Sequence, residues 1–223
     1  LQAWIAFYKA TLNNDNSFRE ELWKEEYSPD YALNVAKNEY LRTDYADTIL
    51  TQIINSPLRK DTSYLYSDMG FYLLAEIIHR ISGKTLDIYL YENFYKPMQL
   101  KNTCFNPLEK INKERIAPTE NDTLFRRQLL CGYVHDQGAA LLGGISGHAG
   151  LFSNIDDLYA IAFMLVNNGF YKNYRYLQKS TIDYFTSYYF PKGHSCRRAL
   201  GFDKPSRGNA PSPCCKAVSS QSF

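Results

Sequence analysis

The sequence predicts a helix-rich fold with few strands, and three stretches support this prediction. The stretch from Asp44 to Ile54 carries isoleucines on one face, and a proline follows it. The stretch from Met69 to Ile81 repeats apolar residues at helical spacing. Asn154 precedes a third apolar stretch, and asparagine at a helix start satisfies backbone N–H groups that would otherwise lack a partner. We therefore expect helices to form most of this chain.

The stretch from Met69 to Ile81 is the strongest helix of the sequence. Its apolar side chains cover more than one face, which predicts a helix buried on most sides. Ser82-Gly83 follows, and glycine readily ends a helix in the left-handed conformation. The apolar residues are Phe71, Leu73, Leu74, Ile77, Ile78 and Ile81.

Weaker signals predict the other elements. The charged stretch from Phe18 to Tyr27 and the segment from Leu86 to Phe94 both read as helices, and Pro97 is expected to end the second. Ser180 opens one more helix toward Tyr189. Residues 142–150 hold several glycines, which favour tight turns or close backbone packing.

Length and charge narrow the class of function. The 223 residues suffice for one large domain or for a domain with a subdomain. The net charge is +2 and the basic residues are scattered, so nucleic acid is not an expected partner. No apolar stretch approaches the roughly 20 residues that span a bilayer. The chain begins at Leu1 with no visible signal peptide, and we expect a processed or partial sequence.

The cysteines predict neither a disulfide framework nor a metal site. None of the five forms a CxxC pair or a Cys/His zinc pattern. Cys214 and Cys215 are adjacent, which is a poor geometry for an ordinary bridge. We therefore expect free thiols.

A tyrosine stands directly before the strongest helix, in Tyr66-Ser67-Asp68. A side chain at a loop-to-helix junction is held by a rigid element, which suits a catalytic group. The helix N-terminus also stabilises a nearby carboxylate or phenolate. The alternative interpretation is that Ser67 or Asp68 caps the helix while Tyr66 packs as an ordinary aromatic residue. These three residues alone leave both interpretations open.

This tyrosine segment resembles the Tyr-x-Asn motif of class C β-lactamases, D-alanyl-D-alanine carboxypeptidases and related esterases. Other segments resemble the same superfamily of serine β-lactamases and penicillin-binding proteins, in the family order and from Leu1 to about Gly201. Each is weak alone, and their joint order carries the resemblance. They are Leu1-Gln2-Ala3-Trp4, Gly70-Phe71-Tyr72-Leu73-Leu74, Ala117-Pro118-Thr119-Glu120, Gly132-Tyr133-Val134-His135-Asp136 and Gly147-His148-Ala149-Gly150-Leu151-Phe152-Ser153.

The resemblance implies acyl transfer to water on a β-lactam, a D-amino-acid peptide or an ester. In such enzymes the serine of Ser-x-x-Lys attacks the acyl carbon, while the lysine and the tyrosine of Tyr-x-Asn pass protons. A strand with Lys-Thr-Gly or His-Thr-Gly helps to form the oxyanion hole. The resemblance gives Tyr66 the catalytic role and makes Asp68 a candidate for substrate binding. His148 is a further candidate for the substrate cleft, and the alternative, which we favour, is a structural histidine held by hydrogen bonds. It implies no metal, no organic cofactor, and a periplasmic or cell-envelope parent protein.

The sequence departs from this family pattern at three points. It contains no Ser-x-x-Lys and no Lys-Thr-Gly or His-Thr-Gly, since Lys84-Thr85-Leu86 fails at the third position. Asp68 replaces the expected asparagine, and a carboxylate cannot donate a hydrogen bond unless it is protonated. This puts penicillin hydrolysis in doubt and favours a peptidase or esterase parent.

Truncation at both ends is the simplest account of the missing motifs. We expect residues 1–223 to be a partial domain that is inactive alone. A tyrosine titrates near pH ~10, and it acts as a base near neutrality only beside cations, which the family takes from those motifs.

The fold implied by the resemblance is α+β, the serine β-lactamase/transpeptidase-like fold. Its sheet is built from both chain ends, with a mainly helical subdomain between them. This chain would hold the helical middle and little of the central sheet. The loss of the sheet would expose apolar helix faces, so we expect self-association.

Two alternatives come from other classes of function. The chain has 19 tyrosines, and a Tyr-rich surface suits a non-catalytic module that binds peptidoglycan or another glycan. His135-Asp136 resembles the metal-binding pair of HD phosphohydrolases, but that fold needs further ligands and the chain has four histidines in all. The segment from Gly144 to His148 is close to a nucleophile elbow, yet lacks its final glycine.

Overall fold

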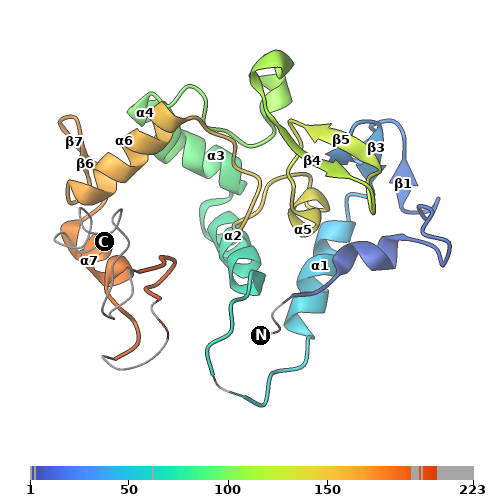
Figure 1. Cartoon of the computed structure of the whole chain (residues 1–223), viewed down its shortest axis with the longest axis horizontal. Helices are drawn as coiled ribbons and strands as arrows, with labels where there is room; N and C mark the ends of the chain where they lie inside the picture. The colour runs from blue at the N-terminus through green and yellow to red at the C-terminus, as the bar shows by residue number, and fades with distance from the viewer. Residues whose placement is uncertain (1, 3, 62, 192–195, 197, 205–223) are drawn as a thin grey trace. The chain divides into compact units, whose positions relative to one another are not determined.

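The computed structural model describes residues 2, 4–61, 63–191, 196 and 198–204 (Figure 1). The chain divides into two compact units, Leu1–Asn154 and Ile155–Phe223. Cys214 and Cys215 lie outside the described residues, so the expectation about their thiols is untested. Of the cysteines within the described residues, Cys104 and Cys131 are free thiols, as expected.

The first unit opens with a 3-10 helix, η1 (Phe7–Thr11), and a small antiparallel sheet. Its strands are β1 (Trp23–Lys24), β2 (Leu33–Ala36) and β3 (Glu39–Leu41), in the order β1-β3-β2. Leu41 on the central strand pairs with Trp23 on one side and Leu33 on the other. Val35 on β2 and Leu41 on β3 are buried and belong to the core.

Two helices complete the core of the first unit. Helix α1 (Tyr45–Ile54) buries Ile49 and Ile53 completely, as predicted, whereas Ile54, which was predicted on the same face, is exposed. Helix α2 (Met69–Ser82) ends at Gly83, which adopts φ 68° and donates its N–H to the carbonyl of His79, as predicted. The core residues are Phe7, Leu22, Trp23, Val35, Leu41, Tyr45, Ile49, Ile53, Met69, Tyr72, Phe125, Val134, Ala139, Ala140 and Leu141.

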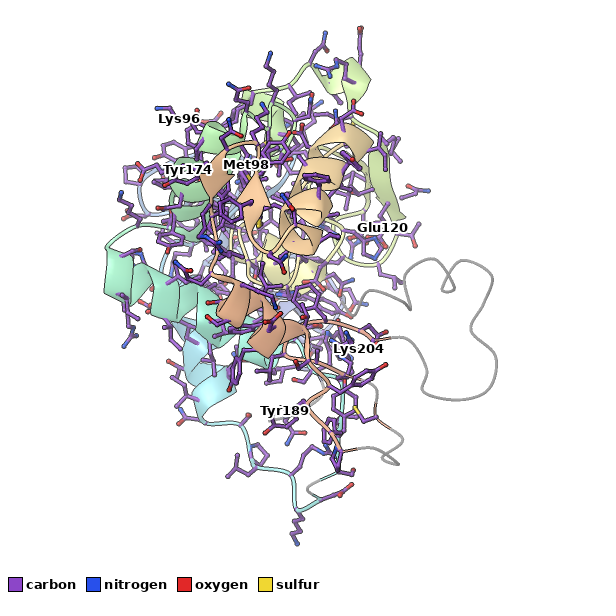
Figure 2. The ribbon with its side chains drawn as sticks, turned by 90° about the vertical axis from the view of Figure 1, so that its left-hand side faces the viewer. Lys96, Met98, Glu120, Tyr174, Tyr189 and Lys204 are labelled. Atoms are coloured by element: carbon purple, nitrogen blue, oxygen red, sulfur yellow. The ribbon has the colours of Figure 1, made fainter. Side chains whose placement is uncertain are left out.

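A continuous helical run follows α2. It consists of α3 (Leu86–Leu90), a π-helical turn η2 (Tyr91–Tyr95) and α4 (Lys96–Met98). Figure 2 labels Lys96 and Met98, the two ends of α4. The prediction that this helix ends at Pro97 was wrong. The proline lies in the first turn of α4, where a helix needs no backbone N–H donor, so the run continues to Met98.

The rest of the first unit is a hairpin between short helical turns. The turns η3 (Pro107–Glu109) and η4 (Lys113–Arg115) precede strands β4 (Pro118–Asp122) and β5 (Gln128–Cys131), which pair antiparallel. Figure 2 labels Glu120 on β4. Helix α5 (Gln137–Ala140) follows. Cys104 and Phe152 then form a two-hydrogen-bond bridge, which fixes the end of the glycine-rich segment.

A fully buried arginine organises the hairpin. The Nε of Arg126 donates to Asp122 Oδ2 at 2.8 Å, and the Arg126 side chain has no exposed area. Its Nη1 donates to the carbonyl of Val134 at 2.6 Å, and its Nη2 to that of His135 at 2.7 Å. The guanidinium therefore ties the hairpin to the segment that leads into α5.

Glu39 is a half-buried carboxyl beside this hairpin, and burial raises its pKa to about 7. Its Oε1 accepts from Gln128 Nε2 at 2.9 Å, whereas its Oε2 has no partner among the described residues. Because the folded pKa exceeds the reference value of 4.5, the folded state holds the proton more tightly than the unfolded state. Stability therefore falls as the pH rises from about 4.5 to about 7.

Glu39→Gln should remove this pH dependence. The neutral amide matches the protonated carboxyl, so the variant should be more stable than the wild type by roughly 1–2 kcal/mol at pH 8, after allowance for solvent screening. Near pH 4 the two should be almost equal. Urea denaturation at both pH values measures the difference. An equal advantage at both would contradict the assigned protonation.

The described residues of the second unit form two helices and a short hairpin. Helix α6 (Ile155–Val166) follows Asn154, as predicted, and β6 (Phe170–Tyr171) pairs with β7 (Tyr174–Arg175). Figure 2 labels Tyr174 on β7. Helix α7 (Lys179–Thr186) matches the prediction for a helix near Ser180 but ends before Tyr189.

The predicted helix from Phe18 to Tyr27 was wrong. The segment contains turns and the two-residue strand β1, and Phe18 forms an isolated bridge with Leu12. The indole of Trp23 stacks on Phe18 with ring centroids 4.3 Å apart and donates its N–H to the carbonyl of Thr11. Aromatic burial against the core therefore overrides the charged helical pattern.

Helix α2 is less buried than predicted. Met69 and Tyr72 reach the core, whereas Leu74, Ile77 and Ile81 are exposed. The apolar pattern correctly predicted a helix. Only the face that carries Met69 and Tyr72 is buried. These exposed side chains are the basis of the expected self-association, which stays a prediction. No helix among the described residues is long and apolar enough to cross a membrane.

Candidate active site

Tyr66 lies at the junction between a loop and helix α2, as the sequence predicts. Its side chain is 57% exposed, so it is not enclosed in the core. The hydroxyl of Ser67 donates to the carbonyl of Gln2 at 2.7 Å and accepts from the backbone N–H of Met69 at 3.2 Å. The buried side chain of Met69 anchors the helix start. The phenol is therefore held on a fixed backbone with its ring open to solvent.

Ser67, and not Asp68, caps α2 with its side chain. Asp68 occupies the N-cap position without any side-chain hydrogen bond to the helix backbone. The hydrogen bond that Ser67 accepts agrees with the interpretation that Ser67 or Asp68 caps the helix, whereas the exposed ring of Tyr66 does not agree with the packing expected there. The Asp68 carboxylate is half-buried at the positive end of the helix, where negative charge is favoured and where it can bind another group.

His148 lies in a buried chain of hydrogen bonds. Its Nε2 lies 2.8 Å from Asp136 Oδ1, and its Nδ1 lies 2.9 Å from the hydroxyl of Ser146. A carboxylate can only accept, so Nε2 carries a proton and a neutral ring would accept the Ser146 proton at Nδ1. The His148 side chain is 5% exposed and Ser146 is 3% exposed. The structure thus fixes the orientation of this imidazole.

Asp136 connects the imidazole to helix α5. The same Oδ1 accepts the N–H of Ala139 at 2.7 Å, so the aspartate is also the N-cap of that helix. Burial alone would raise the pKa of Asp136, but the hydrogen bonds from His148 and the backbone outweigh it and hold the pKa below its usual range. The carboxyl group is therefore ionised at neutral pH.

Tyr72 brings the two parts of the candidate site together. Its ring stacks on the imidazole of His148, with centroids 4.3 Å apart and planes 24° apart. Burial raises the pKa of Tyr72, and the nearby carboxylates of Asp136 and Asp68 raise it further. Tyr72 is therefore a neutral phenol whose ring lies against the imidazole of His148.

The glycine-rich segment packs directly against α2. A Cβ at Gly147 would lie 2.3 Å from the carbonyl oxygen of Phe71, so no side chain fits there. Gly150 has φ +107°, and a Cβ there would lie 2.1 Å from the carbonyl oxygen of Gly144. These contacts confirm the prediction of close backbone packing and set the position of His148.

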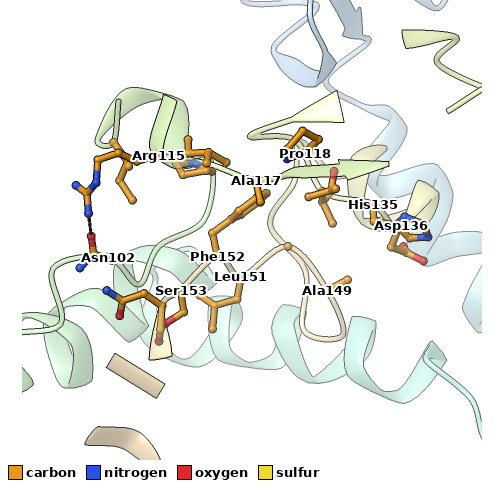
Figure 3. A pocket seen from close by; sticks show the side chains of 17 residues that line it. Asn102, Arg115, Ala117, Pro118, His135, Asp136, Ala149, Leu151, Phe152 and Ser153 are labelled. Atoms are coloured by element: carbon orange, nitrogen blue, oxygen red, sulfur yellow. Dashed lines mark hydrogen bonds between the residues drawn. The ribbon is translucent and has the colours of Figure 1, made fainter. Parts of the chain in front are cut away.

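A cavity of about 580 Å³ opens beside Asp136 (Figure 3). Figure 3 shows His135 and Asp136 near one end and the hydrogen-bonded pair Arg115–Asn102 near the other. Its volume falls in the range of small-molecule sites. The apolar part of its lining comprises Pro107, Ile111, Ile116, Ala117, Pro118, Val134, Leu151 and Phe152.

The described residues contain no cluster of three or more side chains that could hold a metal ion. His135 is exposed and lies 3.5 Å from Glu120, while Asp136 turns toward His148 instead. His135 and Asp136 therefore contact different partners, Glu120 and His148, and do not face one common site.

Sequence reasoning missed three members of this site. Ser146, Tyr72 and Asp136 lie with His148 but had no assigned role. Taken alone, the segment from Gly144 to His148 indicates only an incomplete nucleophile elbow, and His135-Asp136 indicates only a metal-binding pair. Considering them together would have suggested a Ser/His/Asp cluster.

The sequence profile of the Beta-lactamase family matches residues 19–207. The chain belongs to the β-lactamase family. This finding confirms the predicted resemblance and the α+β, β-lactamase/transpeptidase-like fold class. Helices and three small sheets occur among the described residues.

Curated relatives cover part of the chain. The chain is 39% identical over 138 residues to "N-acetylmuramyl-L-alanine amidase" of Bacillus subtilis (strain 168), which is 56% of this chain and 31% of the relative. It is 36% identical over 152 residues to "Putative D-alanyl-D-alanine carboxypeptidase" of Escherichia coli (strain K12), which is 62% of this chain and 35% of the relative. The matched region is thus about a third of the length of these relatives.

The solved structures to which the chain is similar include a penicillin-binding protein homologue and an amidase. The octameric homologue from Pyrococcus abyssi has a TM-score of 0.47 at 16% identity, over 74% of this chain and 35% of that one. The D-amino acid amidase from Ochrobactrum anthropi SV3 has a TM-score of 0.47 at 14% identity, over 75% of this chain and 48% of that one.

Proposed function

We propose that residues 1–223 are the helical middle part of a serine hydrolase that cleaves an amide bond in peptidoglycan-derived peptides. The observation that carries this proposal is the exposed Tyr66 on a fixed helix start, in a chain of the β-lactamase family. The names of the relatives from Bacillus subtilis and Escherichia coli support an amide substrate from the cell wall. Such a substrate favours a place in the periplasm or the cell envelope.

In this proposal the nucleophile is a serine outside residues 1–223. That serine attacks the acyl carbon, and its proton passes to Tyr66. The C–N bond then breaks as the leaving amine takes the proton from Tyr66. Water attacks the acyl-serine, returns a proton to the serine oxygen and releases the acid. The cation that allows Tyr66 to act as a base would come from the same outside segment as the serine.

Asp68 would favour peptides over penicillins. A carboxylate accepts hydrogen bonds and so binds an N–H or ammonium group, whereas an asparagine can also donate to a carbonyl. The cavity beside Asp136, which neither Tyr66 nor Asp68 lines, would take another part of the substrate. The role of His148 is then indirect, because its buried ring fixes Asp136 at the wall of this cavity.

Ser146 is the competing candidate nucleophile within the chain. It has a base and a carboxylate in line, as a Ser/His/Asp triad requires. It is nevertheless 3% exposed, and the tight contacts of Gly147 fix its neighbours. Ser146 and His148 do line a separate cavity of about 360 Å³, but little of the Ser146 side chain is exposed there, so we assign Ser146 to holding His148.

The isolated chain should form no covalent adduct with a labelled penicillin or a fluorophosphonate. Both reagents need an activated serine, and the proposal places that serine elsewhere. Intact-mass measurement after incubation checks this result, with Ser146→Ala as the matched control. A stoichiometric adduct that disappears in Ser146→Ala would contradict the proposal and make Ser146 the nucleophile.

A further inference from the structure

A second cavity of about 390 Å³ lies in the first unit and is lined by tyrosines. Tyr27 and Tyr40 come from the region of the three-stranded sheet, and Tyr133 comes from the segment after β5. None of its lining residues lines the cavity beside Asp136. The proposed acyl-transfer chemistry therefore makes no use of this second cavity.

The tyrosine rings offer both a flat face and an edge. Tyr27 and Tyr40 are T-shaped, with centroids 6.2 Å apart and planes 76° apart, and Tyr27 is 65% exposed. Tyr133 is held more firmly, because its carbonyl accepts the hydroxyl of Thr119 at 2.8 Å. Such rings bind flat apolar surfaces while their hydroxyl groups stay available for hydrogen bonds.

Polar groups surround these rings. The side chain of Asn34 lies against the hydroxyl of Tyr133, and its Oδ1 has no hydrogen-bond partner among the described residues. This oxygen is covered, but the last torsion of asparagine is soft and turns the amide at low cost. Asn106 donates to the carbonyl of Gly143 at 2.9 Å, which fixes its amide at the wall.

The charge of the cavity favours a neutral ligand. Among the described lining residues, Glu109 carries the sole charge, so the cavity offers no cation to a phosphate or carboxylate group. Burial raises the pKa of the Tyr133 hydroxyl, which therefore remains a donor at neutral pH. Leu33, Leu108 and Leu142 add an apolar part to the lining.

We propose that this cavity is a saccharide-binding site that takes neutral sugar rings. A sugar ring has C–H faces that pack on tyrosines and hydroxyl groups that pair with amides and phenols. Glycoside cleavage ordinarily needs two carboxylates, and Glu109 is the single acid among the described lining residues, so the site binds without cleaving. This inference is independent of the proposed hydrolysis, since binding needs no nucleophile.

Titration of the chain with the trisaccharide of N-acetylglucosamine tests the site, by calorimetry or by NMR shifts. We expect saturable binding that Tyr27→Ala and Tyr40→Ala each weaken roughly tenfold, the loss expected for one aromatic contact. Tyr184→Ala is the matched control, because Tyr184 is 67% exposed and lies on α7 in the second unit. It should bind as tightly as the wild type.

Two results would overturn the inference. One is the absence of saturable binding in a chain whose circular dichroism shows it to be folded. The other is binding that Tyr27→Ala and Tyr40→Ala leave unchanged, or that Tyr184→Ala weakens equally. Neither result bears on the proposed hydrolysis, which is measured on the longer protein.

Discussion

Replacing Tyr66 with phenylalanine in the longer protein that contains residues 1–223 should lower kcat by about 10²–10⁴-fold. The substitution removes one hydroxyl from an exposed ring at the start of α2, so the fold has no reason to change. A proton relay acts in the transition state, and kcat/KM should therefore fall together with kcat. Steady-state hydrolysis of a cell-wall peptide with a D-alanyl terminus measures both constants.

Tyr64→Phe is the control for this loss. Tyr64 is an exposed tyrosine two residues earlier in the same loop, and its variant should keep kcat within about twofold. Equal losses in both variants would show an effect on the loop instead of a proton relay. A Tyr66→Phe enzyme with full kcat would remove the catalytic assignment altogether.

Arg126→Met should destabilise this chain by about 3–5 kcal/mol, because it leaves Asp122 buried without its cation. Asp122 is 2% exposed and accepts from Arg126 Nε and from the backbone N–H groups of Leu124, Phe125 and Arg126. The variant also strips the donors from the carbonyls of Val134 and His135. The loss should therefore extend to the segment that positions Asp136.

Arg42→Met is the matched control for this effect. Arg42 makes a two-pronged ion pair with Asp44, at 2.6 and 2.8 Å, but both side chains are exposed. Exposed pairs contribute at most about 1 kcal/mol. Urea denaturation of both variants gives the comparison. A loss below 1 kcal/mol for Arg126→Met would contradict the central place given to the buried pair.

The Arg126 cluster also predicts acid sensitivity. Burial would raise the pKa of Asp122, but the hydrogen bonds from Arg126 and the backbone hold it below the reference value of 3.8. A lowered folded pKa gives stability that is present above about pH 3.8 and is lost as the pH falls below it. This direction is opposite to that of Glu39.

The helices that the sequence predicted correctly are those with local signals. The stretches that became α1 and α2 carry apolar periodicity, and Gly83 ends α2 in the left-handed conformation. Tyr66 could be placed at a helix start for the same reason. The segment from Phe18 to Tyr27 failed because a tertiary contact, the stacking of Trp23 on Phe18, decides its conformation.

The buried part of the site could not be predicted from spacing alone. Asp136 and His148 are twelve residues apart, and their contact depends on α2 placing Tyr72 beneath the imidazole. That placement depends in turn on Gly147 lying against the backbone of Phe71. A glycine-rich run indicates close packing, but it does not indicate the partner.

The site of acylation in the longer protein tests the central claim most directly. The protein would be incubated with a labelled penicillin or a serine-reactive phosphonate, digested, and the modified peptide identified by mass spectrometry. Our account predicts a modified serine outside residues 1–223 and a slower modification in Tyr66→Phe. A modified Ser146, or a modification rate that Tyr66→Phe does not change, would contradict it.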